Sequence, residues 1–148
     1  MRIKILPWIA LAGVFSFGGV ASAQQSGTAA DAQALLQKAA AAVKADKTGA
    51  LAKFDDPNGG FKDRDLYVFC FDSKSGLNLS GPLKGKDMKA VKDSTGKAFG
   101  QEIVEKAKDG SVVTVDYMFP RPNTTDPVAK ESFIEGLGDI ACGVGYYK

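Results

Sequence analysis

Residues 54–71, FDDPNGGFKDRDLYVFCF, hold the two signals that decide the fold. The second half, Leu66–Phe71, is an uninterrupted apolar run that contains strong strand formers, which predicts a β-strand. The first half, Asp55–Gly60, is turn chemistry, because proline fixes φ and the two glycines allow positive φ. We therefore expect a structural corner, anchored by Phe54 and Phe61, that leads the chain from a helical segment into a sheet.

Two stretches have the apolar spacing of helices that pack one face on a core. Residues 31–54 are rich in alanine, which favours helix, and Gly49 is where this helix is expected to end or bend. Residues 97–108 form the second helix, and Gly110 follows it as a C-terminal glycine should. The apolar faces consist of Leu35, Leu36, Ala39 and Val43 in the first stretch, and of Phe99, Ile103, Val104 and Ala107 in the second.

Four further stretches predict strands, at residues 77–79, 111–119, 130–134 and 140–147. Runs of strands joined by short turns indicate an antiparallel sheet with helices packed on it. The sequence therefore predicts an α+β domain.

The first 23 residues predict a secretory signal peptide that is cleaved after Ala23. They begin with two basic residues, continue with an apolar run and end in the small residues Ala21-Ser22-Ala23. A transmembrane anchor is the alternative, but the apolar run is short for a span and is interrupted by a proline and glycines. We expect a periplasmic or secreted protein with a flexible leader at residues 24–30 and one domain at residues 31–148.

The net charge of +2 belongs to the predicted signal peptide. Without Arg2 and Lys4 the positive count falls from 19 to 17 and equals the acidic count of 17. Nucleic acids and anionic membrane surfaces both attract proteins with a basic excess. We therefore expect neither as a partner, and no membrane span after cleavage.

The residue inventory argues against an enzyme, a metal site and a cofactor. The chain has no histidine, so a Ser-His-Asp or Cys-His arrangement is excluded, and two cysteines are too few for a usual zinc site. A calcium loop that starts at Asp56 has Asn58 at its third position, but Phe61 and Tyr67 stand where glycine and glutamate are needed. The aspartates near the corner are more typical of solvated turn caps than of a catalytic pair.

Both cysteines, Cys70 and Cys142, follow the signal peptide and lie in strand-like stretches. Export places them in an oxidising compartment, where a disulfide persists. Whether they form a bridge or remain two buried free thiols depends on whether their α-carbons lie close together, which the residues alone leave open.

Several fragments, in order and spacing, resemble the single Cache domains of bacterial extracytoplasmic sensors. They cover about residues 35–147 and read FDDPNGGF, DLYVFCFDSKSG, LKGKDM, KDSTGKAF, VDYMFPRP, PVAKESFI and GVGYY. The resemblance implies a long N-terminal helix packed on a PAS-like five-stranded antiparallel sheet. It also implies that the first and last strands are central neighbours, which would bring Cys70 and Cys142 together.

The resemblance further implies a pocket between the sheet and its connecting segments for a small organic ligand, often a carboxylate or an amine. Arg121 and Lys130 would supply positive charge for a carboxylate, although Arg121 is equally consistent with a surface loop. Alternate strand residues face opposite ways, so only some of the candidates can line one pocket, and Tyr117 and Lys130 are the strongest. The full set of candidate ligand-binding residues is Tyr67, Phe69, Tyr117, Phe119, Arg121, Lys130 and Tyr146.

The favoured function is a periplasmic or secreted sensor module that binds a small carboxylate or amine and feeds a signalling partner. Most members of the family are held by two membrane helices, whereas here the sequence ends at Lys148 with no second apolar span after the last strand, so we do not expect direct transmembrane signalling. The alternative is a ligand-free accessory protein for a membrane sensor or another exported partner. In that case an exposed face of the long helix would be the contact, as in a homodimer.

Overall fold

The computed structural model describes residues 25–148, so the predicted signal peptide and its cleavage site lie outside the described residues. The α+β class is confirmed. The elements are α1 (Ala29–Ala45), α2 (Lys47–Asp55), β1 (Lys62–Asp63), β2 (Leu66–Asp72), β3 (Asn78–Ser80), the 3-10 turn η1 (Met88–Ala90), α3 (Phe99–Lys106), β4 (Val112–Pro120), β5 (Pro127–Leu137) and β6 (Ile140–Tyr147).

The strands form one antiparallel sheet in the order β1-β2-β6-β5-β4, with β3 also paired to β2. The first long strand and the last strand are therefore central neighbours, as expected. The two-residue β1 adds a sixth strand that the sequence did not predict. In the described part of the chain, no helix combines the length and apolar character needed to cross a membrane.

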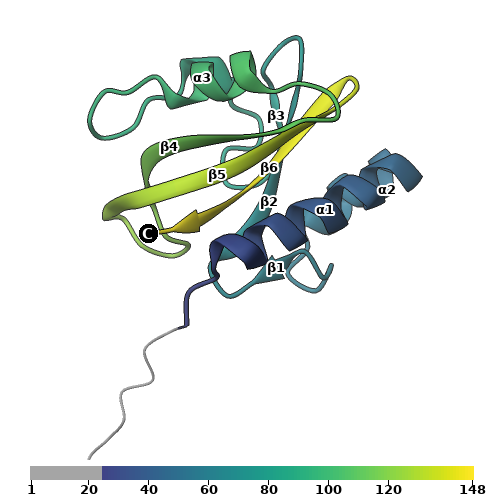
Figure 1. The fold of residues 1–148 in the computed structure, drawn as a ribbon, viewed down its shortest axis with the longest axis horizontal. Helices are drawn as coiled ribbons and strands as arrows, with labels where there is room; N and C mark the ends of the chain where they lie inside the picture. Colours follow the sequence, from purple (N-terminus) through teal and green to yellow (C-terminus); the bar gives the residue numbers. More distant parts are fainter. Residues whose placement is uncertain (1–24) are drawn as a thin grey trace, which may run out of the picture.

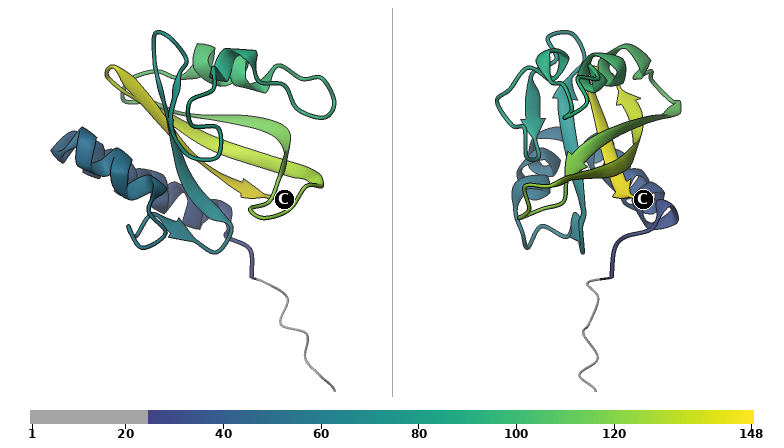
Figure 2. Two further views of the ribbon diagram at one scale, coloured as in Figure 1. Left: turned by 180° about the vertical axis from the view of Figure 1, so that it is seen from behind. Right: turned by 90° about the vertical axis from the view of Figure 1, so that its left-hand side faces the viewer.

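Helices cover both faces of the sheet, with α1 and α2 on one side and α3 on the other (Figures 1 and 2). In β2 the side chains alternate between the two layers. Leu66, Val68 and Cys70 pack with α1, whereas Tyr67, Phe69 and Phe71 pack with η1 and α3. A strand that is covered on both faces needs apolar residues at every position, which explains the uninterrupted run LYVFCF.

The break between α1 and α2 lies at Asp46, three residues before the predicted bend at Gly49. The Asp46 carboxylate caps α2 by accepting a hydrogen bond from the Gly49 N–H at 3.0 Å. A Cβ at Gly49 would lie 2.2 Å from that carboxylate. Gly49 is therefore part of a helix start, because its missing side chain admits the cap.

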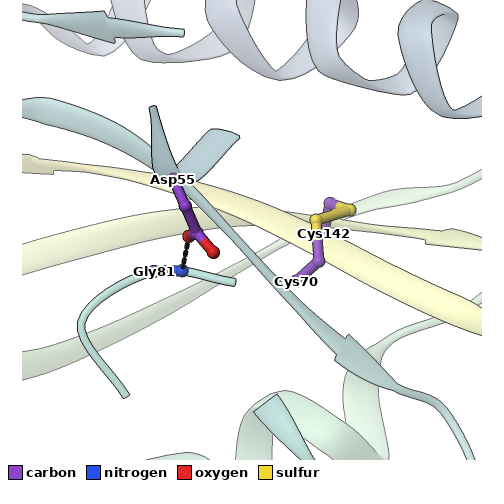
Figure 3. Close-up of a disulfide and its surroundings, with 4 residues drawn as sticks. All are labelled: Asp55, Cys70, Gly81 and Cys142. Carbon is purple, nitrogen blue, oxygen red and sulfur yellow. Dashed lines mark hydrogen bonds between the residues drawn. A yellow bond between two sulfur atoms is a disulfide. The ribbon is translucent and has the colours of Figure 1, made fainter. Parts of the chain in front are cut away.

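The segment Asp55–Gly60 is a structural corner, as predicted. Asp56 accepts a hydrogen bond from the Asn58 N–H at 2.8 Å, which closes a local turn. Phe54 and Phe61, on either side, are buried and meet edge to face with centroids 4.7 Å apart. Figure 3 shows the Asp55 carboxylate accepting from the Gly81 N–H, at 2.9 Å, which ties the corner to the end of β3.

Gly59 is the position in this corner that least tolerates a side chain. An added Cβ would lie 2.1 Å from the Lys53 carbonyl oxygen, so the backbone would have to move. We expect Gly59→Ala to lower the free energy of unfolding by about 3 kcal/mol. Gly60→Ala is the matched control, because Gly60 has a φ of +82° but an added Cβ would meet only the Lys38 Nζ at an ordinary contact distance of 3.6 Å, and it should cost only about 1 kcal/mol. Urea denaturation measures both, and equal losses would contradict the close approach.

Cys70 and Cys142 stand opposite each other on β2 and β6 and form a disulfide, with their α-carbons 4.1 Å apart (Figure 3). Both cysteines are fully buried in the core layer that packs against α1. The pairing that the family resemblance implied is confirmed, and the bridge joins the two central strands of the sheet.

Candidate ligand-binding site

Lys130 on β5 is the charged side chain buried most deeply in the described chain, with 1% of its surface exposed. It lies on the sheet face that carries α3. Gly145 on the neighbouring strand β6 makes room for it, since a Cβ there would lie 2.3 Å from the Lys130 Cε. The glycine-rich stretch near the C-terminus therefore lets a lysine enter the core.

Hydroxyl groups and aromatic rings surround the Lys130 ammonium group. Nζ donates to the Tyr67 hydroxyl at 2.7 Å and to the Tyr147 hydroxyl at 3.4 Å. It also lies 4.2 Å from the centroid of the Tyr67 ring, 4.7 Å from that of Tyr147 and 5.2 Å from that of Phe119. Ring faces stabilise a desolvated cation, but they do not neutralise its charge.

Burial lowers the pKa of Lys130 from 10.5 to about 7, because the charged form loses its hydration. The negative charge of Asp65 opposes this shift but does not cancel it. The Asp65 carboxylate is already paired with the Arg121 guanidinium. Lys130 therefore lacks a carboxylate of its own, and a bound anion would supply the missing charge.

Tyr147 connects Lys130 to the ion pair between Arg121 and Asp65. Its hydroxyl donates to the Pro120 carbonyl oxygen at 2.7 Å, and the Arg121 guanidinium lies 4.6 Å from its ring centroid. Burial raises the pKa of Tyr147 to about 12, so its hydroxyl stays neutral and keeps its proton at physiological pH. The Tyr147 side chain thus contacts both cations of the region.

A small cavity of about 20 Å³ lies on the same face, and it has room for about one water molecule. Tyr117 forms part of its wall by stacking on Phe99 with centroids 4.1 Å apart, and its hydroxyl lies 2.8 Å from the Ser132 Oγ. The lining consists of Tyr67, Phe69, Asn78, Pro82, Leu83, Met88, Phe99, Tyr117 and Phe119.

An outer groove of about 760 Å³ adjoins this cavity. The two spaces share Tyr67, Phe119 and the Pro82-Leu83 pair as a common wall. Arg121 lines the groove but not the cavity. Lys130 lines neither space, but its ammonium group contacts the Tyr67 and Phe119 rings of their common wall.

The structure brings five of the seven candidate residues together, namely Tyr67, Phe69, Tyr117, Phe119 and Lys130. Arg121 lies beside them on the groove, where it pairs with Asp65 and donates to the Ser26 hydroxyl at 3.0 Å. Its role as a carboxylate clamp stays a prediction.

Tyr146 lies apart from this set. Its ring stacks on Phe133 in the layer that packs against α1, and its hydroxyl donates to Glu131 at 3.2 Å. The neighbouring Tyr147 takes its place at Lys130. Asn78, which lines the cavity, is another residue that the sequence analysis missed. Strand alternation places Tyr146 and Tyr147 on opposite faces, and the pairing of β5 with β6 shows that Tyr147 is the one opposite Lys130.

Two solved sensor domains share this fold. A Cache chemosensory domain studied for carboxylic acid recognition matches with a TM-score of 0.65 and 22% identity over 80% of this chain and 91% of that one. The periplasmic sensor domain of a chemotaxis protein matches with a TM-score of 0.61 and 24% identity over 78% of this chain and 86% of that one. At these identities the matches establish the fold.

Sequence comparison points in the same direction. The methyl-accepting chemotaxis protein McpP of Pseudomonas putida is 36% identical over 76 residues, which cover 49% of this chain and 14% of that protein. This chain therefore spans about a seventh of that relative. The profile of the Cache domain family matches residues 35–145, most of the described chain. The protein therefore belongs to the Cache domain family of ligand-sensing modules.

Proposed function

We propose that this Cache domain binds a small carboxylate at Lys130 and passes the occupancy of the site to a signalling partner outside the cytoplasm. The observation that carries the proposal is the buried Lys130 ammonium group, which has hydroxyl and aromatic neighbours but no carboxylate of its own. Buried charges in proteins are normally paired, and an isolated one is costly. A ligand carboxylate would complete the pair.

The charge balance of the region favours an anion over an amine. When Lys130 is protonated, it and Arg121 provide two positive charges, whereas Asp65 provides one negative charge and already pairs with Arg121. A monocarboxylate makes the group neutral, while a bound ammonium would add a third positive charge. Because the site has low polarity, both the attraction of a carboxylate and the repulsion of an ammonium group are stronger there than in water.

The small cavity limits the size of the ligand. Its volume of about 20 Å³ fits about one water molecule, so even a short acid needs some displacement of the lining. Aromatic side chains and Met88 form most of the wall and would pack on a short alkyl chain. We therefore propose an acid with a short carbon chain.

Two relatives support the ligand class and the signalling role. One structural neighbour was studied for carboxylic acid recognition, and the matching relative McpP is a chemotaxis receptor. The export predicted from residues 1–23 would place the domain where nutrients and metabolites are sensed. The identity of the partner, a membrane-bound sensor or a second copy, is part of the proposal.

A thermal-shift screen of residues 24–148 tests the ligand class. We expect acetate or propionate to raise the melting temperature by about 5–15 °C at 100 times its Kd, which corresponds to about 2.7 kcal/mol. Ethylamine and calcium chloride should give no shift. Stabilisation by the amine alone would contradict the proposal, and no response to any carboxylate would favour the ligand-free accessory protein.

A further inference from the structure

We propose that Asn78 determines which carboxylates the site prefers, by accepting a hydrogen bond from an uncharged donor on the ligand, such as a hydroxyl group. The inference rests on the proposed carboxylate site and adds a second point of recognition to it. Lys130 would hold the carboxylate, and the Asn78 amide oxygen would hold the donor.

The Asn78 amide is buried and its orientation is fixed. The residue begins β3, is 2% exposed and lines the cavity. Its Nδ2 donates to the Lys86 carbonyl oxygen at 3.0 Å. Turning the amide over would place two oxygens against each other, so the Oδ1 atom must point away from Lys86.

The Asn78 Oδ1 has no hydrogen-bond partner in the described chain. The other hydroxyl groups of the lining are already engaged, since the Tyr67 hydroxyl accepts from Lys130 and the Tyr117 hydroxyl bonds to Ser132. A buried acceptor without a partner is costly, and native proteins rarely leave one. Asn78 lines the cavity of one water's size, which gives a ligand hydroxyl a place to bind near this amide.

The donor should carry no charge. No carboxylate lines the cavity, and Tyr67, which forms one wall, also bonds the Lys130 ammonium group. A ligand ammonium in the cavity would therefore face a positive charge with no negative group to offset it. This favours hydroxy acids over both amino acids and unsubstituted acids of the same length.

Calorimetric titration with four acids of three carbons tests the inference. The probes are propionate, 2-hydroxypropionate, 3-hydroxypropionate and alanine, and the protein is residues 24–148. We expect at least one hydroxy acid to bind about 10-fold more tightly than propionate, and alanine to bind more weakly than propionate.

The variant Asn78→Leu should lose the preference for the hydroxy acid. The ratio of the Kd of propionate to that of the hydroxy acid should fall to about 1 while propionate still binds. Ser80→Ala is the matched control, because the Ser80 Oγ also lacks a partner but does not line the cavity, and it should keep the ratio. Circular dichroism melting checks that both variants fold.

The outcomes separate the inference from the proposed function. Equal binding of propionate and both hydroxy acids by the unaltered protein would overturn the role of Asn78 and leave the carboxylate site in place. An unchanged preference in Asn78→Leu would overturn it as well. Binding of none of the four acids would overturn the proposed function and, with it, the inference.

Discussion

Lys130→Met is expected to weaken the binding of propionate by about 100-fold at pH 6.5 without unfolding the domain. The substitution keeps the volume of the side chain and removes the charge that would pair with the ligand carboxylate. Removing one partner of a buried charge pair typically costs about 2–5 kcal/mol of binding energy. Calorimetric titration measures the change in Kd. Lys53→Met on the exposed face of α2 is the control and should bind propionate like the unaltered protein.

The same variant should remove a pH dependence of stability. The pKa of Lys130 is about 7 in the folded protein and 10.5 in the unfolded chain, so the unfolded state binds more protons between these values. The free energy of unfolding contributed by this group therefore rises as the pH increases from about 7 to 10.5, by at most about 5 kcal/mol. Urea denaturation between pH 7 and 10.5 should show this rise in the free energy of unfolding for the control Lys53→Met. The rise should be absent in Lys130→Met. Equal slopes in the two variants would contradict the burial of a charged lysine.

Removing the disulfide is expected to destabilise the domain strongly. The bridge closes a sequence separation of 72 residues, so the chain-entropy model predicts a loss of about 4 kcal/mol in the double variant Cys70→Ala/Cys142→Ala. For a domain of this size the loss corresponds to a decrease of roughly 10–20 °C in the melting temperature. Calorimetric melting of both proteins measures it.

Reduction of the unaltered protein provides the control for this prediction. A reducing agent should lower the melting temperature of the unaltered protein and leave that of the double variant unchanged. Propionate should still stabilise the variant at low temperature, because the cysteines pack against α1 and Lys130 lies on the opposite face. If the double variant melted less than about 3 °C below the unaltered protein, the bridge would contribute little to stability.

The parts of the fold that local patterns determine were predictable. The run LYVFCF gave the central strand, and turn chemistry gave the corner before it. The predicted bend at Gly49 was displaced because glycine there serves the Asp46 cap, a contact that composition does not reveal. The two-residue β1 has too few residues to show any alternation.

The candidate site was predictable in kind but not in detail. Tyr146 and Tyr147 are adjacent and chemically identical, so the choice between them depends on which strand face meets α3. The sequence shows a lysine at position 130 but not that Gly145 on another strand allows its burial. The pairing of Arg121 with Asp65 joins residues 56 positions apart, which only the tertiary structure brings together.

Proton uptake on binding tests the central claim, a carboxylate held by the buried Lys130 ammonium group. Propionate is titrated calorimetrically at pH 8 in two buffers of different ionisation enthalpy, and the difference in the heats gives the protons bound. With a pKa of about 7, Lys130 is mostly neutral in the free protein at pH 8, and an anion beside it would restore its charge. The account predicts uptake of most of one proton at pH 8 and almost none at pH 6. Propionate binding at pH 8 with no proton uptake would contradict it.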